Sequence, residues 1–273
     1  MFFGGFWYEK DENDEEQWLD LMSKTVSEVF NVPVSHILRK ERRKQKGESQ
    51  YEKSTETSIV KGRVQEQGQL FNVDLSSYID TGLFFDHRPL RAVVRNSSSG
   101  KAVLNLFCYT GSFSVYAAEG NAKSVESVDL SNTYLNWAKE NMKLCGLENN
   151  RIRFIVDDVI KFLEREKRRV RTYHGIIMDP PSYGRGPKGE IWKIEESIHS
   201  FIKLCSNLLS DNPLFFLVNS YTTGLAPAVL TYMISTEIVK PFGGHVESEE
   251  IGLPVKNTGL VLPCGASGRW SKE

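Results

Sequence analysis

The chain has 273 residues, of which 40% are hydrophobic and 25% charged, and its net charge is −1 at neutral pH. This length suits one large α/β domain with a small appendage, and the near-neutral charge excludes a generally basic nucleic-acid binder. No apolar run reaches the length of a membrane span, and the aromatic, then acidic N-terminus is unlike a secretory signal. We therefore expect a cytoplasmic protein without a membrane partner.

The cysteines and histidines follow no ligand or disulfide pattern. The four cysteines are Cys108, Cys145, Cys205 and Cys264. None belongs to a C-x-x-C pair, and the five histidines show no H-E-x-x-H spacing. We expect reduced thiols and no protein-bound metal. Nothing in these patterns indicates the oligomeric state.

Residues 1–95 are predicted to form a small α+β extension that contacts RNA. Residues 14–30, DEEQWLDLMSKTVSEVF, place apolar side chains at helical spacing and predict a helix. Residues 35–44, SHILRKERRK, are interpreted as a strand. Residues 58–75, SIVKGRVQEQGQLFNVDL, alternate on both sides of a turn at Glu66–Gly68 and predict a β-hairpin.

Residues 96–273 are predicted to form the catalytic domain, beginning in the polar connector RNSSSGK at 95–101. Five strand patterns, each followed by a helical one, are AVLNLF, SVESVD, IRFIVDD, YHGIIMD and PLFFLVN. Residues 244–263 supply two last strands. This alternation predicts an α/β fold with a Rossmann-like, mainly parallel, seven-stranded sheet. Ligands of such sheets bind beyond the carboxyl ends of the strands.

The junction after the first of these strands is polar and carries a single glycine. It contains Asn105, Phe107, Tyr109, Thr110 and Gly111. A dinucleotide fingerprint needs G-x-G-x-x-G, so a phosphate-binding loop is excluded. A turn of this kind lets the backbone approach a small ligand that lacks phosphates.

Acidic residues end the next two strands. Asp129 is placed to accept hydrogen bonds from the ribose hydroxyls of a nucleoside, and the alternative is a cap for the helix that opens at Ser131. The third strand ends at Asp157 and Asp158. One of the two can accept from an adenine amino group while the other caps the helix near Val159, and the residues alone leave that division open.

The fourth strand runs into Asp179-Pro180-Pro181-Ser182-Tyr183. Proline cannot continue a helix or a ladder, so the strand stops abruptly and the acid is held at its tip. The Asp179 carboxylate and the Pro180 carbonyl are acceptors for an N–H of a planar base, and Tyr183 offers a stacking face. The alternative is a purely structural stop.

This set of strand ends resembles that of class I S-adenosylmethionine-dependent methyltransferases. The segments TGLFFDHRPLR, VLNLFCYTGSFSVYAAEG, VDLSNTYLNWAKENMKL, VDDVIKFL and MDPPSY are similar to the bacterial 23S rRNA methyltransferase family. The branch that they resemble most is the guanine-N7 half of the bifunctional guanine methyltransferase. The similarity runs from about residue 35 to residue 183, and the C-terminal third resembles a smaller branch of methyltransferases.

The resemblance implies a cofactor and a set of site residues. The cofactor is S-adenosyl-L-methionine. Its implied contacts are Asn105, Phe107, Tyr109, Thr110, Gly111, Asp129, Leu130, Asp158, Asp179, Asp86 and Arg88. The choice of Asp158 over Asp157 follows the family's pattern. Asp179, Pro180 and Tyr183 are the implied catalytic residues.

The implied substrate is an RNA base, with ribosomal RNA as the expected partner and guanine N7 or an exocyclic amine as the favoured target. Arg42, Arg43 and Lys188 are candidates for phosphate contacts. Trp192 and Tyr221 are candidates for stacking on a base. An incidental surface charge is the alternative for each cation.

The sequence gives less support to four other functions. Methylation of cytosine at C5 needs a thiolate, and the related branch places a cysteine where this chain has Ser220. Methylation of a protein or a small molecule, or a non-catalytic RNA-binding role, is open to a nuclease or turnover test. A nicotinamide-dependent oxidoreductase is disfavoured because the glycine fingerprint is missing.

Overall fold

The computed structural model describes residues 12–40, 60–185 and 191–273. The chain divides into two compact units, Met1–Val60 with Leu75–Ile79 and Lys61–Asp74 with Asp80–Glu273. Each unit is considered by itself. The hairpin predicted near residue 66 groups with the larger unit, and the role of residues 1–95 as an RNA-contacting domain stays a prediction.

In the smaller unit, helix α1 (Glu12–Phe30) confirms the predicted amphipathic helix. The strand predicted over 35–44 is wrong for the residues that the structure describes. The chain instead forms the 3₁₀ turn η1 (Val34–His36), in which the His36 N–H donates to the Pro33 carbonyl at 2.9 Å. Local turn hydrogen bonds take the place of a ladder here, and residues 41–44 lie outside the described residues.

The predicted hairpin is confirmed in the larger unit. Strand β1 (Lys61–Glu66) pairs antiparallel with β2 (Gln69–Asp74), and Glu66 lies opposite Gln69. Gln67 and Gly68 have φ values of 48° and 94°, which is the left-handed pair that a two-residue hairpin turn requires.

The predicted Rossmann-like sheet is also confirmed. Seven strands lie in the order β10-β11-β9-β6-β3-β4-β5. Their bounds are β3 (Ala102–Leu106), β4 (Ser124–Asp129), β5 (Ile152–Val156), β6 (Gly175–Met178), β9 (Phe215–Ser220), β10 (His245–Pro254) and β11 (Val261–Ser271). Strand β11 runs antiparallel to both of its neighbours, β10 and β9, and the other neighbouring pairs of this sheet are parallel. The chain starts at β3, winds outward to β5 and returns to β6, so the strand order reverses between β3 and β6.

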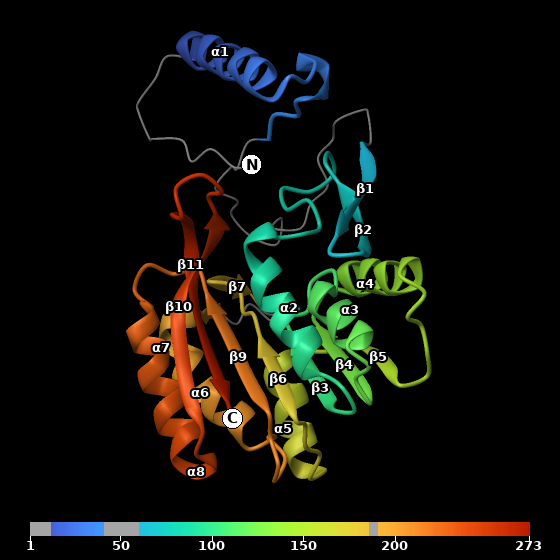
Figure 1. The fold of residues 1–273 in the computed structure, drawn as a ribbon, viewed down its shortest axis with the longest axis vertical. Coiled ribbons are helices and arrows are strands. Elements are labelled where there is room, and N and C mark those ends of the chain that lie inside the picture. The colour runs from blue at the N-terminus through green and yellow to red at the C-terminus, as the bar shows by residue number, and fades with distance from the viewer. Residues whose placement is uncertain (1–11, 41–59, 186–190) are drawn as a thin grey trace. The chain divides into compact units, whose positions relative to one another are not determined.

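Helices cover both faces of this sheet (Figure 1). One face packs against α5 (Val159–Arg168), α6 (Ile194–Ser206) and α7 (Pro227–Ile234), and α7 continues into the π-helical turn η4 (Ser235–Val239) and α8 (Lys240–Phe242). The other face packs against α2 (Arg88–Ser97) and α3 (Ser112–Glu119). Helix α4 (Asn132–Leu144) and the hairpin share a third apolar cluster with α3.

Four elements differ from the prediction. Helix α2 was not expected, and it extends into the segment interpreted as a connector at 95–101. Its inward face carries only Leu90 and Val94 with the buried Arg91, so the apolar signal is short. Strand β11 continues to Ser271 because it pairs with β10 from Val261 to Ser271 and with β9 from Ala266 to Ser271. A small antiparallel pair, β7 (Tyr183–Arg185) and β8 (Ile191–Lys193), follows the proline step.

Within the described ranges, every helix is too short or too polar to cross a membrane. Side chains of His, Cys, Asp and Glu in those same ranges form no group of three or more that could hold a metal ion.

Candidate functional site

Many of the predicted site residues lie at the carboxyl ends of β3, β4, β6 and β9, around the reversal of strand order. Asp129 ends β4, and Asp179 follows the last residue of β6. Tyr221 follows β9 directly. Because parallel strands end at the same edge of the sheet, segments far apart in the sequence meet there.

The turn after β3 has an unusual backbone. Phe107, Tyr109 and Gly111 all have positive φ, at 54°, 48° and 74°. Gly111 precedes the first residue of α3, and a Cβ at this position would lie 2.7 Å from the Cβ of Ala138. Glycine is therefore required both by the conformation and by the close packing of α4. Such strained turns concentrate at ligand sites.

Asp129 is held by backbone groups. Its Oδ2 accepts from the Tyr109 N–H at 3.0 Å and its Oδ1 accepts from the Ser131 N–H at 2.8 Å. Burial raises the pKa of this carboxyl, and the backbone hydrogen bonds oppose that shift. The N-cap of α4 is Ser131, whose Oγ accepts from Tyr134 N–H. Asp129 thus precedes the cap, and each of its oxygens keeps a lone pair for a ligand hydroxyl.

Thr110 and Asn105 lie behind the turn. Thr110 is buried, its Oγ1 donates to the Gly82 carbonyl at 2.6 Å, and its own carbonyl accepts from Asn141 Nδ2 at 3.0 Å. Asn105 is buried on β3 and its Nδ2 donates to Ser114 Oγ at 2.8 Å. These contacts fix the shape of the turn, and a direct role of either side chain in binding the cofactor stays a prediction.

The aromatic and apolar side chains of the turn lie at its surface side. The hydroxyl of Tyr109 donates to the Asp80 carbonyl at 3.1 Å, and its ring packs edge-on against Tyr134 with centroids 4.6 Å apart. Leu130, next to Asp129, is exposed. An exposed apolar side chain beside a ribose-type carboxylate suits contact with the flat face of an adenine ring.

The structure divides the two acids after β5. Asp158 is the N-cap of α5 and accepts from the Lys161 N–H at 3.0 Å through Oδ1. Asp157 forms an ion pair with Arg165. Asp157 is therefore committed to a charge partner. Asp158 uses one oxygen as a cap, and the role of its other oxygen as an adenine contact stays a prediction.

Asp179 lies at the tip of β6, next to the buried Pro180. Its Oδ2 is 3.6 Å from His87 Nδ1, an ion-pair distance. Burial raises the pKa of Asp179, and the neighbouring His87 opposes the shift. Perturbed carboxyls of this kind concentrate at functional sites, although structural networks perturb them as well.

Trp192 connects the proline step to the cofactor turn. Its Nε1 donates to the Pro181 carbonyl at 2.7 Å. Its ring lies 5.9 Å from that of Phe107 and 5.6 Å from that of Phe201. Tyr183 lies in β7 with an exposed side chain. The structure thus brings Trp192 and Tyr183 to the same edge as Asp179.

Tyr221 has partners that the sequence did not indicate. Its hydroxyl donates to Asp86 Oδ2 at 2.8 Å and also contacts His87 Nε2. Burial raises the pKa of this phenol far above its usual range. Its hydroxyl is therefore occupied, and only its ring is free for the predicted stacking. His87 was missed because the motif FFDHRPLR gives no local signal that a histidine faces β6 and β9.

Arg88 is engaged with the hairpin. Its Nε donates to Glu66 Oε2 at 3.1 Å. The fully buried Arg91 makes two further bonds to the same carboxylate at 2.8 Å, and Tyr116 donates to it as well. This network anchors the hairpin to α2 and α3. The predicted contact of Arg88 with the cofactor stays a prediction.

Several predicted phosphate contacts cannot be placed. Arg42, Arg43 and Lys188 lie outside the described residues. Residues 161–171 carry six cations, of which Arg165, Arg169 and Arg171 form ion pairs with Asp157 or Glu166. These three arginines therefore have partners within the fold.

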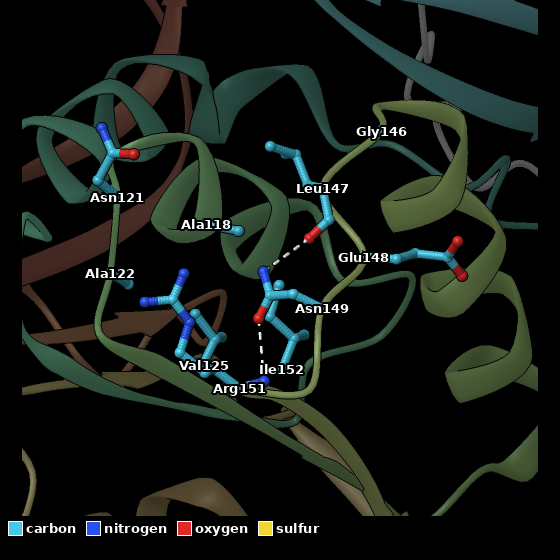
Figure 2. A pocket seen from close by; sticks show the side chains of 10 residues that line it. All are labelled: Ala118, Asn121, Ala122, Val125, Gly146, Leu147, Glu148, Asn149, Arg151 and Ile152. Atoms are coloured by element: carbon cyan, nitrogen blue, oxygen red, sulfur yellow. Dashed lines mark hydrogen bonds between the residues drawn. The ribbon is translucent and has the colours of Figure 1, made fainter.

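A pocket of about 250 Å³ lies elsewhere. Figure 2 shows its lining, in which Asn149 accepts from the Arg151 N–H and donates to the Leu147 carbonyl. Ala122 and Ile152 place it where the chain enters β4 and β5. This is the amino end of the strands, opposite to the edge that gathers the site residues.

Comparisons with known proteins agree with this geometry. A family model described as S-adenosylmethionine-dependent methyltransferase matches residues 23–220. The crystal structure of the SAM-dependent methyltransferase from Agrobacterium tumefaciens is 31% identical, with a TM-score of 0.73. That similarity covers 80% of this chain and 72% of the other.

The names of two curated relatives mention ribosomal RNA. The ribosomal RNA large subunit methyltransferase K of Neisseria meningitidis is 40% identical over 208 residues, which are 75% of this chain and 58% of that protein. The ribosomal RNA large subunit methyltransferase K/L of Cellvibrio japonicus is 42% identical over 181 residues, which are 66% of this chain and 24% of that protein. The chain therefore spans less than two thirds of the curated relatives that it matches.

Proposed function

Because this chain belongs to the S-adenosylmethionine-dependent methyltransferase family, we propose that it methylates an RNA base, and that the RNA is ribosomal. The observation that carries the proposal is the position of Asp179-Pro180 at the tip of β6, at the same sheet edge as the Asp129 turn. One end of the site suits a nucleoside cofactor and the other suits a planar base. A cytoplasmic location fits this proposal.

The residues of the Asp129 turn fit S-adenosyl-L-methionine. When bound, this cofactor supplies an electrophilic methyl group on a sulfonium. Asp129 has free lone pairs for two ribose hydroxyls. The exposed Leu130 side chain and the second oxygen of Asp158 support the assignment of these residues to the adenine ring and its amino group. The turn Phe107–Gly111 has no phosphate loop, which suits a cofactor that carries an amino acid in place of phosphates.

The acceptor end positions the base. The Asp179 carboxyl and the Pro180 carbonyl accept N–H groups of its edge, and Tyr183 stacks on its face. Methyl transfer needs the attacking nitrogen, the methyl carbon and the sulfur in line, so orientation is the main contribution, about 7–11 kcal/mol in well-ordered systems. Guanine N7 has an in-plane lone pair and needs no base. An exocyclic amine is served by the same acceptors.

The names of the curated relatives support ribosomal RNA as the substrate. Both are named as methyltransferases of the large ribosomal subunit RNA. The family model covers residues 23–220, which include the turn, Asp129 and Asp179. The chain covers 58% and 24% of the two curated relatives, so the proposal concerns only the part of those proteins that this chain shares.

Cytosine-C5 methylation is the alternative, and the cysteines give it little support. Ser220 is buried at the end of β9, where the C5 branch has its cysteine. Cys108 is buried in the cofactor turn, and burial raises the pKa of its thiol well above the usual range. Such a thiol is not a nucleophile at neutral pH.

The test uses labelled S-adenosyl-L-methionine, ribosomal RNA from cells that lack the gene, and nucleoside mass analysis. We expect a labelled guanosine or a labelled exocyclic amine, and its loss in Asp179→Ala. The exposed Asp211, in a loop before β9, is the matched control, and Asp211→Ala keeps full transfer. Labelled 5-methylcytidine, or no label in RNA from an enzyme that binds the cofactor, contradicts the proposal.

A further inference from the structure

His87 lies at the centre of the acceptor end and has two polar partners. It ends the 3₁₀ turn η3 (Phe85–His87) and is 2% exposed. Its Nδ1 faces Asp179 Oδ2 at 3.6 Å, and its Nε2 contacts the hydroxyl of Tyr221. Phe113 covers the ring at a centroid distance of 5.4 Å. A buried imidazole with a partner on each nitrogen has a defined protonation state.

The hydrogen bonds among Asp86, Tyr221, His87 and Asp179 restrict where protons can lie. The Tyr221 hydroxyl has one proton and donates it to Asp86 Oδ2. Its oxygen is then an acceptor toward His87, so Nε2 carries a proton. If Nδ1 were bare, its lone pair would face an ionised Asp179 in a buried site, which is repulsive. A further proton on the pair, placed on Nδ1 toward Asp179, removes this repulsion.

The surroundings of this pair are mixed in charge. The titratable and charged groups that face it from the packed elements are Asp86 on η3, Arg91 on α2, Tyr221 after β9 and Cys264 on β11. The negative charge of Asp86 favours binding of a proton at Asp179, and the positive charge of Arg91 disfavours it. Tyr221 and Cys264 both have pKa values raised by burial, so they stay neutral near neutral pH.

We propose that His87 is a positioning residue, which shares one proton with Asp179 and, beside the neighbouring Asn219, orients this carboxylate to receive an N–H of the methyl-accepting base. This rests on the proposed function of the site. The substrate class that fits is a base with an exocyclic amine beside a ring N–H, as guanine has in its amino group and N1, whereas guanine N7 has no N–H beside it. The 3.6 Å separation shortens when the base is bound, as acid–base contacts do in substrate complexes.

Two isosteric variants separate positioning from packing. Asparagine places its amide near the position of Nδ1, so His87→Asn keeps a donor to Asp179. Glutamine places its amide near Nε2, so His87→Gln keeps the contact with Tyr221 and loses the donor that faces Asp179. Both variants lose the ring that packs on Phe113. We expect kcat within about threefold of wild type for His87→Asn and a fall of about tenfold or more for His87→Gln, with the cofactor Kd unchanged in both.

The pH dependence adds a second readout. The wild-type kcat/KM falls as pH rises and the shared proton is lost, and His87→Asn, whose amide does not titrate, lacks this alkaline limb. His245→Asn is the control, because His245 is exposed at the start of β10. Equal losses in His87→Asn and His87→Gln, or an unchanged alkaline limb in His87→Asn, overturn the inference.

A measurement without RNA keeps this inference separate from the proposed function. Nitrogen-15 histidine spectra of the whole protein at neutral pH should show a proton on Nε2 and a proton on Nδ1 of His87. Asp179→Asn, which removes the carboxylate partner, should leave Nδ1 bare. A bare Nδ1 at neutral pH in the wild type contradicts the inference. Absence of methyl transfer to RNA with Nδ1 protonated contradicts only the proposed function.

Discussion

The two ends of the candidate site are built differently. At the cofactor end, backbone N–H groups of Tyr109 and Ser131 hold Asp129, and positive φ values fix the turn. At the acceptor end, side chains from distant segments meet, since Tyr221 bonds to Asp86 and His87, and His87 faces Asp179. The cofactor end is therefore formed mainly by the turns that follow β3 and β4. The acceptor end forms only when the strands of the sheet have assembled.

The largest effect is expected at the acceptor end. Asp179→Ala should lower kcat by about 100-fold or more, because positioned acid–base groups contribute roughly 10²–10⁴-fold. The sequence also implied a contact of Asp179 with the cofactor, whereas the present proposal assigns Asp179 to the base. The cofactor Kd should therefore stay within about threefold, since Asp129 and the turn are untouched. Single-turnover transfer to ribosomal RNA and isothermal titration with the cofactor measure the two quantities. A parallel rise in the cofactor Kd would break the division between the two ends.

Asp129→Asn tests the cofactor end. The amide keeps the shape but offers one acceptor in place of two, and it sets a donor against the backbone N–H groups of Tyr109 or Ser131. Hydrogen bonds to charged groups contribute about 1.5–3 kcal/mol, so the cofactor Kd should rise by about 10- to 100-fold. The kcat at saturating cofactor should change little. An unchanged Kd would remove Asp129 from the cofactor site.

A smaller effect is expected where the two ends touch. Trp192→Phe keeps a ring against Phe107 but removes the Nε1 bond to the Pro181 carbonyl. A neutral hydrogen bond contributes about 0.5–1.5 kcal/mol, so the KM for RNA should rise by roughly 2- to 10-fold. Steady-state kinetics with varied RNA checks this. A change in the cofactor Kd alone would place Trp192 with the cofactor end.

The smallest effect concerns stability. Burial raises the pKa of Asp179 in the folded protein, so the folded state binds more protons than the unfolded state above the ordinary carboxyl range. The contribution of this group to stability is therefore greatest at acid pH and falls as pH rises through the folded pKa. Asp179→Asn should raise Tm at neutral pH and flatten its dependence on pH, as thermal unfolding at several pH values would show. A lower Tm at neutral pH would contradict this.

The same comparison explains how much the sequence could predict. The strands, the hairpin turn at Gln67–Gly68 and the glycine at 111 have local signals in periodicity and turn chemistry. Helix α2 has only two apolar side chains on its inner face and was missed. His87 and its contacts with Tyr221 and Asp179 depend on pairing between segments more than 90 residues apart in the sequence, which no local pattern carries.

The central claim is that one end of the site binds the cofactor and the other positions the base. The most direct measurement is the cofactor Kd and the single-turnover rate of methyl transfer to ribosomal RNA for Asp129→Asn and Asp179→Asn, side by side. We predict that Asp129→Asn weakens cofactor binding with transfer preserved at saturation. Asp179→Asn should bind the cofactor normally and transfer slowly. Equal losses of binding and rate in both variants would contradict the division.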